Sequence, residues 1–294
     1  MRLAASYDSE SMKPALCLLY AVMLCGLLCS SLQAQAPAST SQQAPAPYIP
    51  PQNPTPPPGP VPISEEPRHR LVLQNDFVRV YNVMVPGLDA TLLHRHDLPY
   101  LYVTLGAADI INAIVDKPEV HLVLQDGETH YSPGHFAHIV RTDSGMPFQN
   151  VTIELVRPQG TVKNLCKEVL PGAPTDCPEK QPAADNSKAK KNQPARAADD
   201  DPYFETDEMR VDLHKVSSGN DYVDATPKTD ALLVALTNAN LDANLGGEHV
   251  SFLHGGDVLW MPAGQRRRIV DFLGTNSSFL LISFKDSAPA PKTQ

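Results

Sequence analysis

The feature that most constrains the fold of this chain is an internal repeat of β-rich sequence. Short segments of the first half recur in the second half in the same order and at a nearly constant offset: 75–80 with 206–211, 101–105 with 232–236, and Gly127 and Pro133 with Gly256 and Pro262. Several such matches in order indicate an internal duplication. The chain should therefore contain two copies of one domain.

Each copy has the pattern of short strands. Residues 70–85, 101–115 and 121–124 are rich in Val, Ile, Leu and Tyr, and turn dipeptides such as Asp126-Gly127 and Pro133-Gly134 separate them. No long amphipathic helix is evident. Short strands at this spacing are typical of a sandwich or barrel, so the sequence predicts an all-β protein of two tandem β-barrels.

The N-terminus has the pattern of a secretory signal peptide, predicted over residues 1–34. Lys13 precedes an apolar run, 15–29, that is short for a membrane span, and Ala34 and Ala36 have the spacing of a cleavage site. Translation can start at Met1 or Met12. We expect a periplasmic or secreted protein with no membrane span in the mature chain. The alternative is an uncleaved membrane anchor.

Two compositionally biased segments set the expected domain boundaries. Residues 35–68 are rich in Pro, Ala, Gln and Ser and predict a disordered spacer, and residues 178–201 are polar and charged and predict a disordered interdomain linker. The expected order is the first barrel at 69–160, a linker region at 161–202, the second barrel at 203–286 and a tail at 287–294.

Cysteine usage and charge limit the partners. Removal of the signal peptide leaves Cys166 and Cys177, which flank a short turn-rich stretch. In an oxidising compartment we expect them to form a disulfide, and two free thiols are the alternative. The net charge of −9 argues against nucleic acid, because a polyanion binder needs a basic face. The basic run 188–191 lies in the predicted linker and is interpreted as solvated.

Three histidines of the first barrel form a candidate metal site. His94 and His96 are one residue apart, so on a strand they point to the same face. His138 follows the Pro133-Gly134 turn, and strands distant in sequence can face each other across a barrel. Three neutral imidazoles suit Fe, Zn, Cu, Ni or Mn and leave positions open for water or substrate.

This pattern resembles the cupin superfamily of small jelly-roll β-barrels. The first cupin motif is Gly, His-x-His, a Glu three or four residues on, and Gly; the second is Gly, five residues, Pro-x-Gly, two residues, His, and an Asn. The positions that fit are Gly87, His94, His96 and Gly106 for the first motif, and Gly127, Pro133 and His138 for the second. The resemblance implies a two-domain cupin in which His94, His96 and His138 bind one divalent transition metal (Fe, Mn, Ni or Zn).

The chain departs from the family pattern at three positions. The expected Glu falls near Tyr100 or Leu101, where no carboxylate stands, His135 occupies the second glycine position, and Thr142 replaces the Asn. The resemblance then implies an all-histidine site, as in cupins similar to thiol or diketone dioxygenases. Tyr100 shares strand parity with His94 and His96, and we expect it to line the pocket and act in any catalysis.

Other polar residues of the first barrel are weaker candidates. His130 and His135 flank the same hairpin, where a surface position is the simpler expectation than contact with a ligand or substrate. Glu154 alternates with Asn150 and Thr152 and is a remote substitute ligand; a solvent-facing alternation is the simpler interpretation. His121 has no evident partner in the sequence.

The second barrel has lost the candidate ligands. The duplication aligns His94 with Ala225, His96 with Pro227 and His138 with Arg267, none of which suits a metal. The second barrel is therefore expected to be structural. An anion pocket around Arg266, Arg267 and Arg268 is the alternative, and salt bridges with a neutralised inner arginine are the simpler expectation.

The predicted function is a metal-dependent oxidation or isomerisation of a small organic molecule, with His94, His96 and His138 as ligands. The rival hypothesis is a non-catalytic binding or scaffold protein of the envelope that kept the fold. A metal-free sugar-epimerase-like cupin is a third possibility, but it needs a paired acid and base that the sequence does not offer. The expected partner is a small molecule, and the chain is expected to be a monomeric bicupin or a homodimer.

Overall fold

The computed structural model describes residues 59–178 and 201–285, and these are almost entirely β-strand. A single turn of 3-10 helix, η1 (Ile63–Glu65), interrupts the strands of that part. Within these two ranges no helix is long and apolar enough to cross a membrane. The predicted signal peptide, most of the spacer, the centre of the linker and the C-terminal tail lie outside the described residues.

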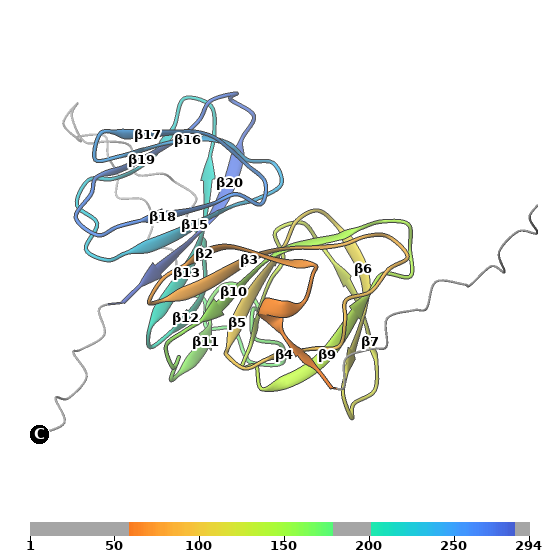
Figure 1. Cartoon of the computed structure of the whole chain (residues 1–294). Coiled ribbons are helices and arrows are strands. Elements are labelled where there is room, and N and C mark those ends of the chain that lie inside the picture. Colours follow the sequence, from red (N-terminus) through yellow and green to blue (C-terminus); the bar gives the residue numbers. More distant parts are fainter. Residues whose placement is uncertain (1–58, 179–200, 286–294) are drawn as a thin grey trace, which may run out of the picture. The chain divides into compact units, whose positions relative to one another are not determined.

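The first half of the described chain forms two five-stranded sheets (Figure 1). One sheet has the order β1 (Val61–Pro62), β4 (His94–His96), β9 (Phe136–Arg141), β6 (Ala108–Ile114) and β7 (Val120–Leu124). The other has the order β2 (His69–Gln74), β3 (Val78–Val85), β10 (Phe148–Leu155), β5 (Tyr100–Thr104) and β8 (Thr129–Ser132).

The strand pairing of this half is nested. β3 pairs with β10, β4 with β9, β5 with β8 and β6 with β7, all antiparallel. Such a pattern results when one long hairpin is rolled up into two facing sheets, which is the jelly-roll arrangement. The arrangement makes β4 and β9 direct neighbours although about forty residues separate them, and this neighbourhood positions the candidate site.

The second half repeats the same order. One of its sheets contains β11 (Val162–Asn164), β12 (Asp201–Thr206), β13 (Met209–Val216), β20 (Ser277–Phe284), β15 (Ala231–Ala235) and β18 (Val258–Met261). The other contains β14 (Asp221–Asp224), β19 (Arg267–Asp271), β16 (Asn240–Leu245) and β17 (Glu248–His254). The nested pairs recur as β13 with β20, β14 with β19, β15 with β18 and β16 with β17. The predicted all-β fold and its duplication are confirmed.

Each half has its own core between its two sheets. In the first half Val83 and Val85 of β3 pack with Ile110 of β6 and Val140 of β9. In the second half Leu233 of β15 packs in a cluster with Leu241, Ile269 and Phe279. A third cluster combines apolar side chains of both halves, including Val80, Ile153, Phe204 and Val211. Strands that contribute to two clusters are buried on both faces, and they are therefore the most continuously apolar in the sequence.

The ordered structure extends beyond the predicted barrel boundaries. β1 pairs in parallel with β4, and Ile63 and Glu66 are buried, so residues 61–68 belong to the first domain and not to the predicted spacer. On the linker side, β11 pairs with β12, and the disulfide Cys166–Cys177 closes a loop with a sequence separation of 11. The proline content of residues 61–68 led to the prediction of a disordered spacer. A few prolines, however, do not prevent a short strand from pairing at the edge of a sheet.

Candidate metal centre

The nested pairing brings three of the predicted residues together. His94 of β4 is the register partner of His138 of β9, and His96 lies two residues further along the same face of β4. The Nε2 atom of His138 lies 3.0 Å from Nε2 of His94 and 3.1 Å from Nε2 of His96. The sequence suggested histidines facing each other across the barrel; His94 and His138 are instead cross-strand neighbours.

A strained turn holds the two strands in this register. Gly134 has a φ of +72°, and a Cβ atom on it would lie 2.1 Å from the carbonyl oxygen of Leu98, so a side chain is excluded there. His135 also has a positive φ of 62°, and its amide donates to the carbonyl oxygen of His96 at 2.6 Å. A histidine thus adopts the conformation of the glycine that the cupin motif has at this position.

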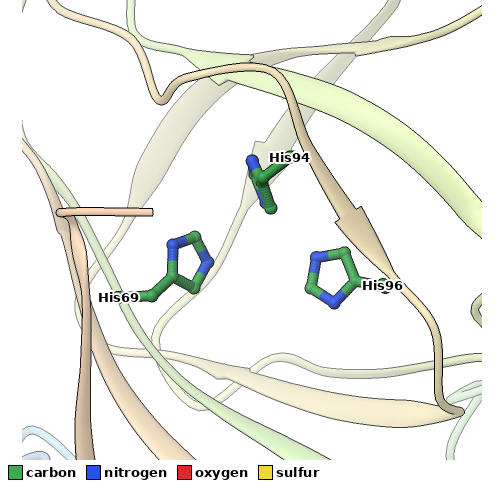
Figure 2. Close-up of side chains that lie close together, drawn as sticks. All are labelled: His69, His94 and His96. Atoms are coloured by element: carbon green, nitrogen blue, oxygen red, sulfur yellow. The ribbon is translucent and has the colours of Figure 1, made fainter. Parts of the chain in front are cut away.

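A fourth histidine, which the sequence did not indicate, completes the cluster. His69 begins β2 in the opposite sheet, and its side chain is 5% exposed. Ligand nitrogens of His69, His94 and His96 lie within 4.8 Å of one another, and Figure 2 shows the three rings around a common space. His69 is not part of a His-x-His pair and follows a proline-rich segment, so nothing in the sequence indicated that it belongs to the site. Its place next to the other histidines follows from the pairing of β2 with β3.

Hydrogen bonds to the outer ring nitrogens fix which nitrogen faces the centre. Nδ1 of His94 donates to the carbonyl oxygen of Leu92 at 2.9 Å, and Nδ1 of His138 donates to Oδ1 of Asn112 at 2.8 Å. Nδ1 of His69 donates to Glu66 at 2.6 Å. A neutral imidazole carries one proton, so each of these rings presents an unprotonated Nε2 to the centre.

Burial keeps the rings of His94, His96 and His138 neutral. It lowers the pKa of His94 to about 4, with a further contribution from the neighbouring His69. Burial and the adjacent histidines also hold the pKa of His96 and of His138 well below the usual value. At neutral pH the lone pairs of the ring nitrogens are therefore free for a ligand bond.

The donor set fits a transition metal. The lone pairs of His94 Nε2 and His138 Nε2 face each other at 3.0 Å, an arrangement that repels unless a cation lies between them. Nδ1 of His96 is buried and has no hydrogen-bond partner in the described part of the chain, so no hydrogen bond at Nδ1 fixes the tautomer of this ring. Imidazole nitrogens that converge in this way suit Fe, Mn, Ni, Cu and Zn.

Tyr100 lies beside the cluster but not on the strand where the sequence placed it. It begins β5 in the other sheet, and residues 97–99 separate it from the end of β4 at His96, so shared strand parity does not explain its position. Its ring stacks on His96 with a centroid distance of 4.1 Å and an interplanar angle of 20°. Burial raises the pKa of Tyr100 to about 12 despite a hydrogen bond with Ser132, so the hydroxyl stays protonated.

The histidines and Tyr100 line a cavity of about 50 Å³. It is also lined by apolar side chains such as Val85, Ile110 and Phe148, and by polar groups that include Asn112, Asn150 and Thr152. The hydroxyl of Thr152 donates to Asn150 at 2.7 Å. None of the described residues that line the cavity carries a carboxylate, so acid or base chemistry there has imidazole, phenol, amide and hydroxyl groups available.

The weaker candidates lie away from this cavity. Glu154 is 2% exposed and lies 3.6 Å from the guanidinium of Arg79, which makes it a buried ion-pair member. His130 hydrogen-bonds Glu128 at 2.9 Å, and exposed His121 pairs with Asp109. Thr142, at the motif's Asn position, donates to the carbonyl oxygen of Pro86 at 2.7 Å, a structural contact.

The second domain has an arginine where the first has a metal-facing histidine. Arg267 pairs with Leu245 as His138 pairs with Ile114, which confirms that Arg267 and His138 correspond. Arg267 of β19 is the register partner of Asp224 of β14, just as His138 of β9 is the register partner of His94 of β4. The predicted match of His94 with Ala225 is therefore wrong by one residue, because the two domains differ in length before this strand.

Arg267 fills the centre of the second domain. It is 2% exposed, and its Nη2 atom donates to the carbonyl oxygens of Thr229, Met261 and Pro262. Burial lowers the pKa of the guanidinium, and the carboxylates of Asp224 and Asp230 oppose the shift. In the described residues, the cluster of His, Cys, Asp or Glu side chains with metal-binding geometry lies in the first domain.

Comparison with solved structures finds similar folds. AerE from Microcystis aeruginosa is 11% identical over 75% of this chain and 99% of that chain, with a TM-score of 0.47. A salicylate 1,2-dioxygenase G106A mutant from Pseudoaminobacter salicylatoxidans is 11% identical over 71% of this chain and 70% of that chain, with a TM-score of 0.47. A cupin 2 conserved barrel domain protein from Leptotrichia buccalis is 9% identical over 74% of this chain and 88% of that chain, with a TM-score of 0.44.

These similarities concern the fold. A scan of protein-family models finds no match, and a search of curated proteins finds none either. Two features of the chain itself resemble the cupin pattern. The nested pairing of eight strands is that of a jelly roll and occurs twice, and the first copy carries the His-x-His and Pro-Gly…His pattern on β4 and β9. The chain therefore has a two-domain fold of the cupin (jelly-roll) type.

Proposed function

We propose that the first domain holds one divalent transition metal through His69, His94, His96 and His138. The observation that carries this proposal is the convergence of unprotonated Nε2 atoms, two of them 3.0 Å apart, in a buried cavity. Buried acceptors that face each other without a donor are unfavourable, because each lacks a hydrogen bond. A bound cation gives both lone pairs a partner.

The spacing of the nitrogens is compatible with one shared ion. Two nitrogens about 2.1 Å from one ion lie about 3.0 Å apart at a right angle and about 3.4 Å apart at the tetrahedral angle. The observed separations of 3.0 and 3.1 Å lie within this range. We propose Fe(II), Mn(II), Ni(II) or Zn(II) as the metal.

The cavity sets the size of the proposed substrate. A cavity of about 50 Å³ that also holds the ion leaves room for a small molecule only. A bound metal would act as a Lewis acid toward an oxygen atom of such a molecule. The apolar walls exclude bulk water, Tyr100 and Thr152 offer hydroxyl groups, and the stack on Tyr100 orients His96. Oxidation or isomerisation of a small organic molecule is the reaction class that we propose.

A non-catalytic metal-binding or scaffold role is the second candidate. The observation that favours it is the lack of a carboxylate among the described residues that line the cavity, because general acid–base catalysis often uses one. A metal centre without turnover would bind the ion and a small ligand, and the rest of the protein would act as a scaffold.

We also propose that the protein functions in an oxidising compartment as an exported protein. The disulfide between Cys166 and Cys177 supports this proposal, because such bonds are rare in reducing compartments. Sequencing the N-terminus of the protein recovered from an exporting host tests it. An intact Met1 or Met12 in the exported form would contradict cleavage of the signal peptide.

Metal loading tests the proposed function directly. Protein treated with a chelator and then loaded separately with Fe(II), Mn(II), Ni(II) or Zn(II) should bind about one ion per chain with at least one of them, since the ligand cluster of the described residues lies in the first domain. The melting temperature should rise on loading. At a free metal concentration one hundred times the dissociation constant, the free energy of unfolding should increase by about 2.7 kcal/mol. Far less than one ion per chain with all four metals would refute the proposal.

A further inference from the structure

Glu66 is a buried carboxylate that no step of the proposed function uses. It lies directly after η1, in the segment that the sequence predicted to be a disordered spacer, and it is 2% exposed. A carboxylate that leaves water without partners is strongly unfavourable, so a position this buried requires compensation by hydrogen bonds. The contacts of Glu66 show how the protein compensates.

Three donors surround the two oxygens of Glu66. Oε1 accepts from the amide of Leu92 at 3.1 Å, and Oε2 accepts from the amide of Arg68 at 2.8 Å. Oε2 also accepts from Nδ1 of His69 at 2.6 Å. Leu92 in turn supplies the carbonyl oxygen that holds Nδ1 of His94. Glu66 thus connects the segments that carry two of the converging histidines.

The cupin motif has a glutamate among the residues that contact the metal, and this chain has none at that position. His69 adds a neutral ligand in its place, which leaves the ligand set without a negative charge. Glu66 lies on the far side of the His69 ring and donates no oxygen to the cavity. A carboxylate hydrogen-bonded to a ligating histidine fixes the ring and increases its basicity.

We propose that Glu66 is a positioning residue that acts on the metal through His69. The inference rests on the proposed metal site. Glu66 accepts a hydrogen bond from Nδ1 of His69 and so directs Nε2 of His69 into the cavity. It also places a negative charge next to the ligand set, where the cupin motif has a glutamate among the ligands.

The test compares metal affinity in four proteins: wild type, Glu66→Gln, His69→Ala and the double variant. The dissociation constant for Mn(II) and Ni(II) is measured by competition with a chelator. Glu66→Gln should weaken binding about 10- to 100-fold. In the His69→Ala background the same substitution should change the affinity by less than about 3-fold, because the group through which Glu66 acts is gone.

Glu128→Gln is the matched control. Glu128 also accepts from one histidine, His130 Nε2 at 2.9 Å, and from one backbone amide, that of Gln125 at 2.8 Å. It differs from Glu66 in that its histidine does not line the cavity. Its substitution should leave the metal affinity unchanged.

A purely structural role of Glu66 predicts a different result. The side-chain amide that Glu66→Gln introduces would place a donor against the backbone amide of Leu92 or Arg68, so the metal-free protein loses stability in either case. Equal weakening of metal binding with and without His69 would overturn the proposal. Unchanged affinity of Glu66→Gln with normal binding by the wild type would also overturn it, whereas absence of binding by the wild type would refute the proposed metal site itself.

A measurement on the wild type covers the case in which Glu66→Gln does not fold. Nitrogen-15 NMR of the histidine rings in Zn(II)-loaded protein reports which ring nitrogen carries the proton. His69 should be protonated on Nδ1, with its proton shifted downfield by the bond to Glu66, and Nε2 should carry no proton. Protonation of His69 on Nε2 would overturn the inference.

Discussion

His138→Ala should lower the affinity of the protein for its metal by more than about 100-fold, which exceeds the usual effect of a change outside the ligand set. His138 is central to the cluster, because its Nε2 lies within 3.1 Å of Nε2 of both His94 and His96. The loss of this nitrogen removes the proposed ligand atom that lies close to both His94 and His96, and so weakens metal binding. Titration of the metal-free variant with Ni(II), followed calorimetrically, measures the change.

His121→Ala is the control for this substitution. His121 belongs to the same sheet, but it is exposed and pairs with Asp109 away from the cavity. Its replacement should leave both the affinity and the metal-induced rise in melting temperature as in the wild type. Retention of wild-type affinity by His138→Ala would show that the ion, if bound, lies elsewhere.

Arg267→Ala should destabilise the protein by about 3–5 kcal/mol, because it removes a large buried side chain and leaves backbone carbonyl groups without their donor. The carbonyl oxygens of Thr229, Met261 and Pro262 all accept from its Nη2 atom. The metal content of the folded variant should stay at the wild-type value, because the ligands belong to the first domain. Urea denaturation followed by tryptophan fluorescence measures the free energy of unfolding.

Arg266→Ala provides the comparison for this effect. Arg266 is the preceding residue and is exposed, so its removal should change the free energy of unfolding by less than about 0.5 kcal/mol. A loss below about 1 kcal/mol for Arg267→Ala would contradict the view that this arginine replaces the metal as the central group of the second domain. A fall in metal content of the folded Arg267→Ala variant would contradict the assignment of the site to the first domain.

The sequence predicted those parts of the fold that depend on local pattern and on repetition. Turn dipeptides and apolar runs indicated the strands, and the repeat indicated two domains. His94 and His96 could be placed on one face because strand side chains alternate. The sequence also indicated that His138 lies near them, but the cross-strand pairing of His94 with His138 is known only from the structure.

The rest of the site depends on tertiary contacts that leave little trace in the sequence. His69 faces the other histidines only because β2 belongs to the opposite sheet, and β2 contains an irregularity between Leu71 and Leu73 that shifts its register. Glu66 stands in a proline-rich context that is typical of a spacer. In the second domain a change of one residue in length moved Asp224, not Ala225, opposite Arg267. Such shifts are visible in the strand register but not in an ungapped comparison of the two halves.

The central claim is that four imidazoles of the first domain hold one metal ion. Anomalous diffraction from crystals of the protein loaded with Mn(II) or Ni(II), recorded on both sides of the absorption edge of the metal, locates the ion directly. We expect one strong peak per chain, about 2.0–2.2 Å from Nε2 of His69, His94, His96 and His138, and no peak near Arg267. A peak that none of these four nitrogens contacts, or no peak at full loading, would contradict the account.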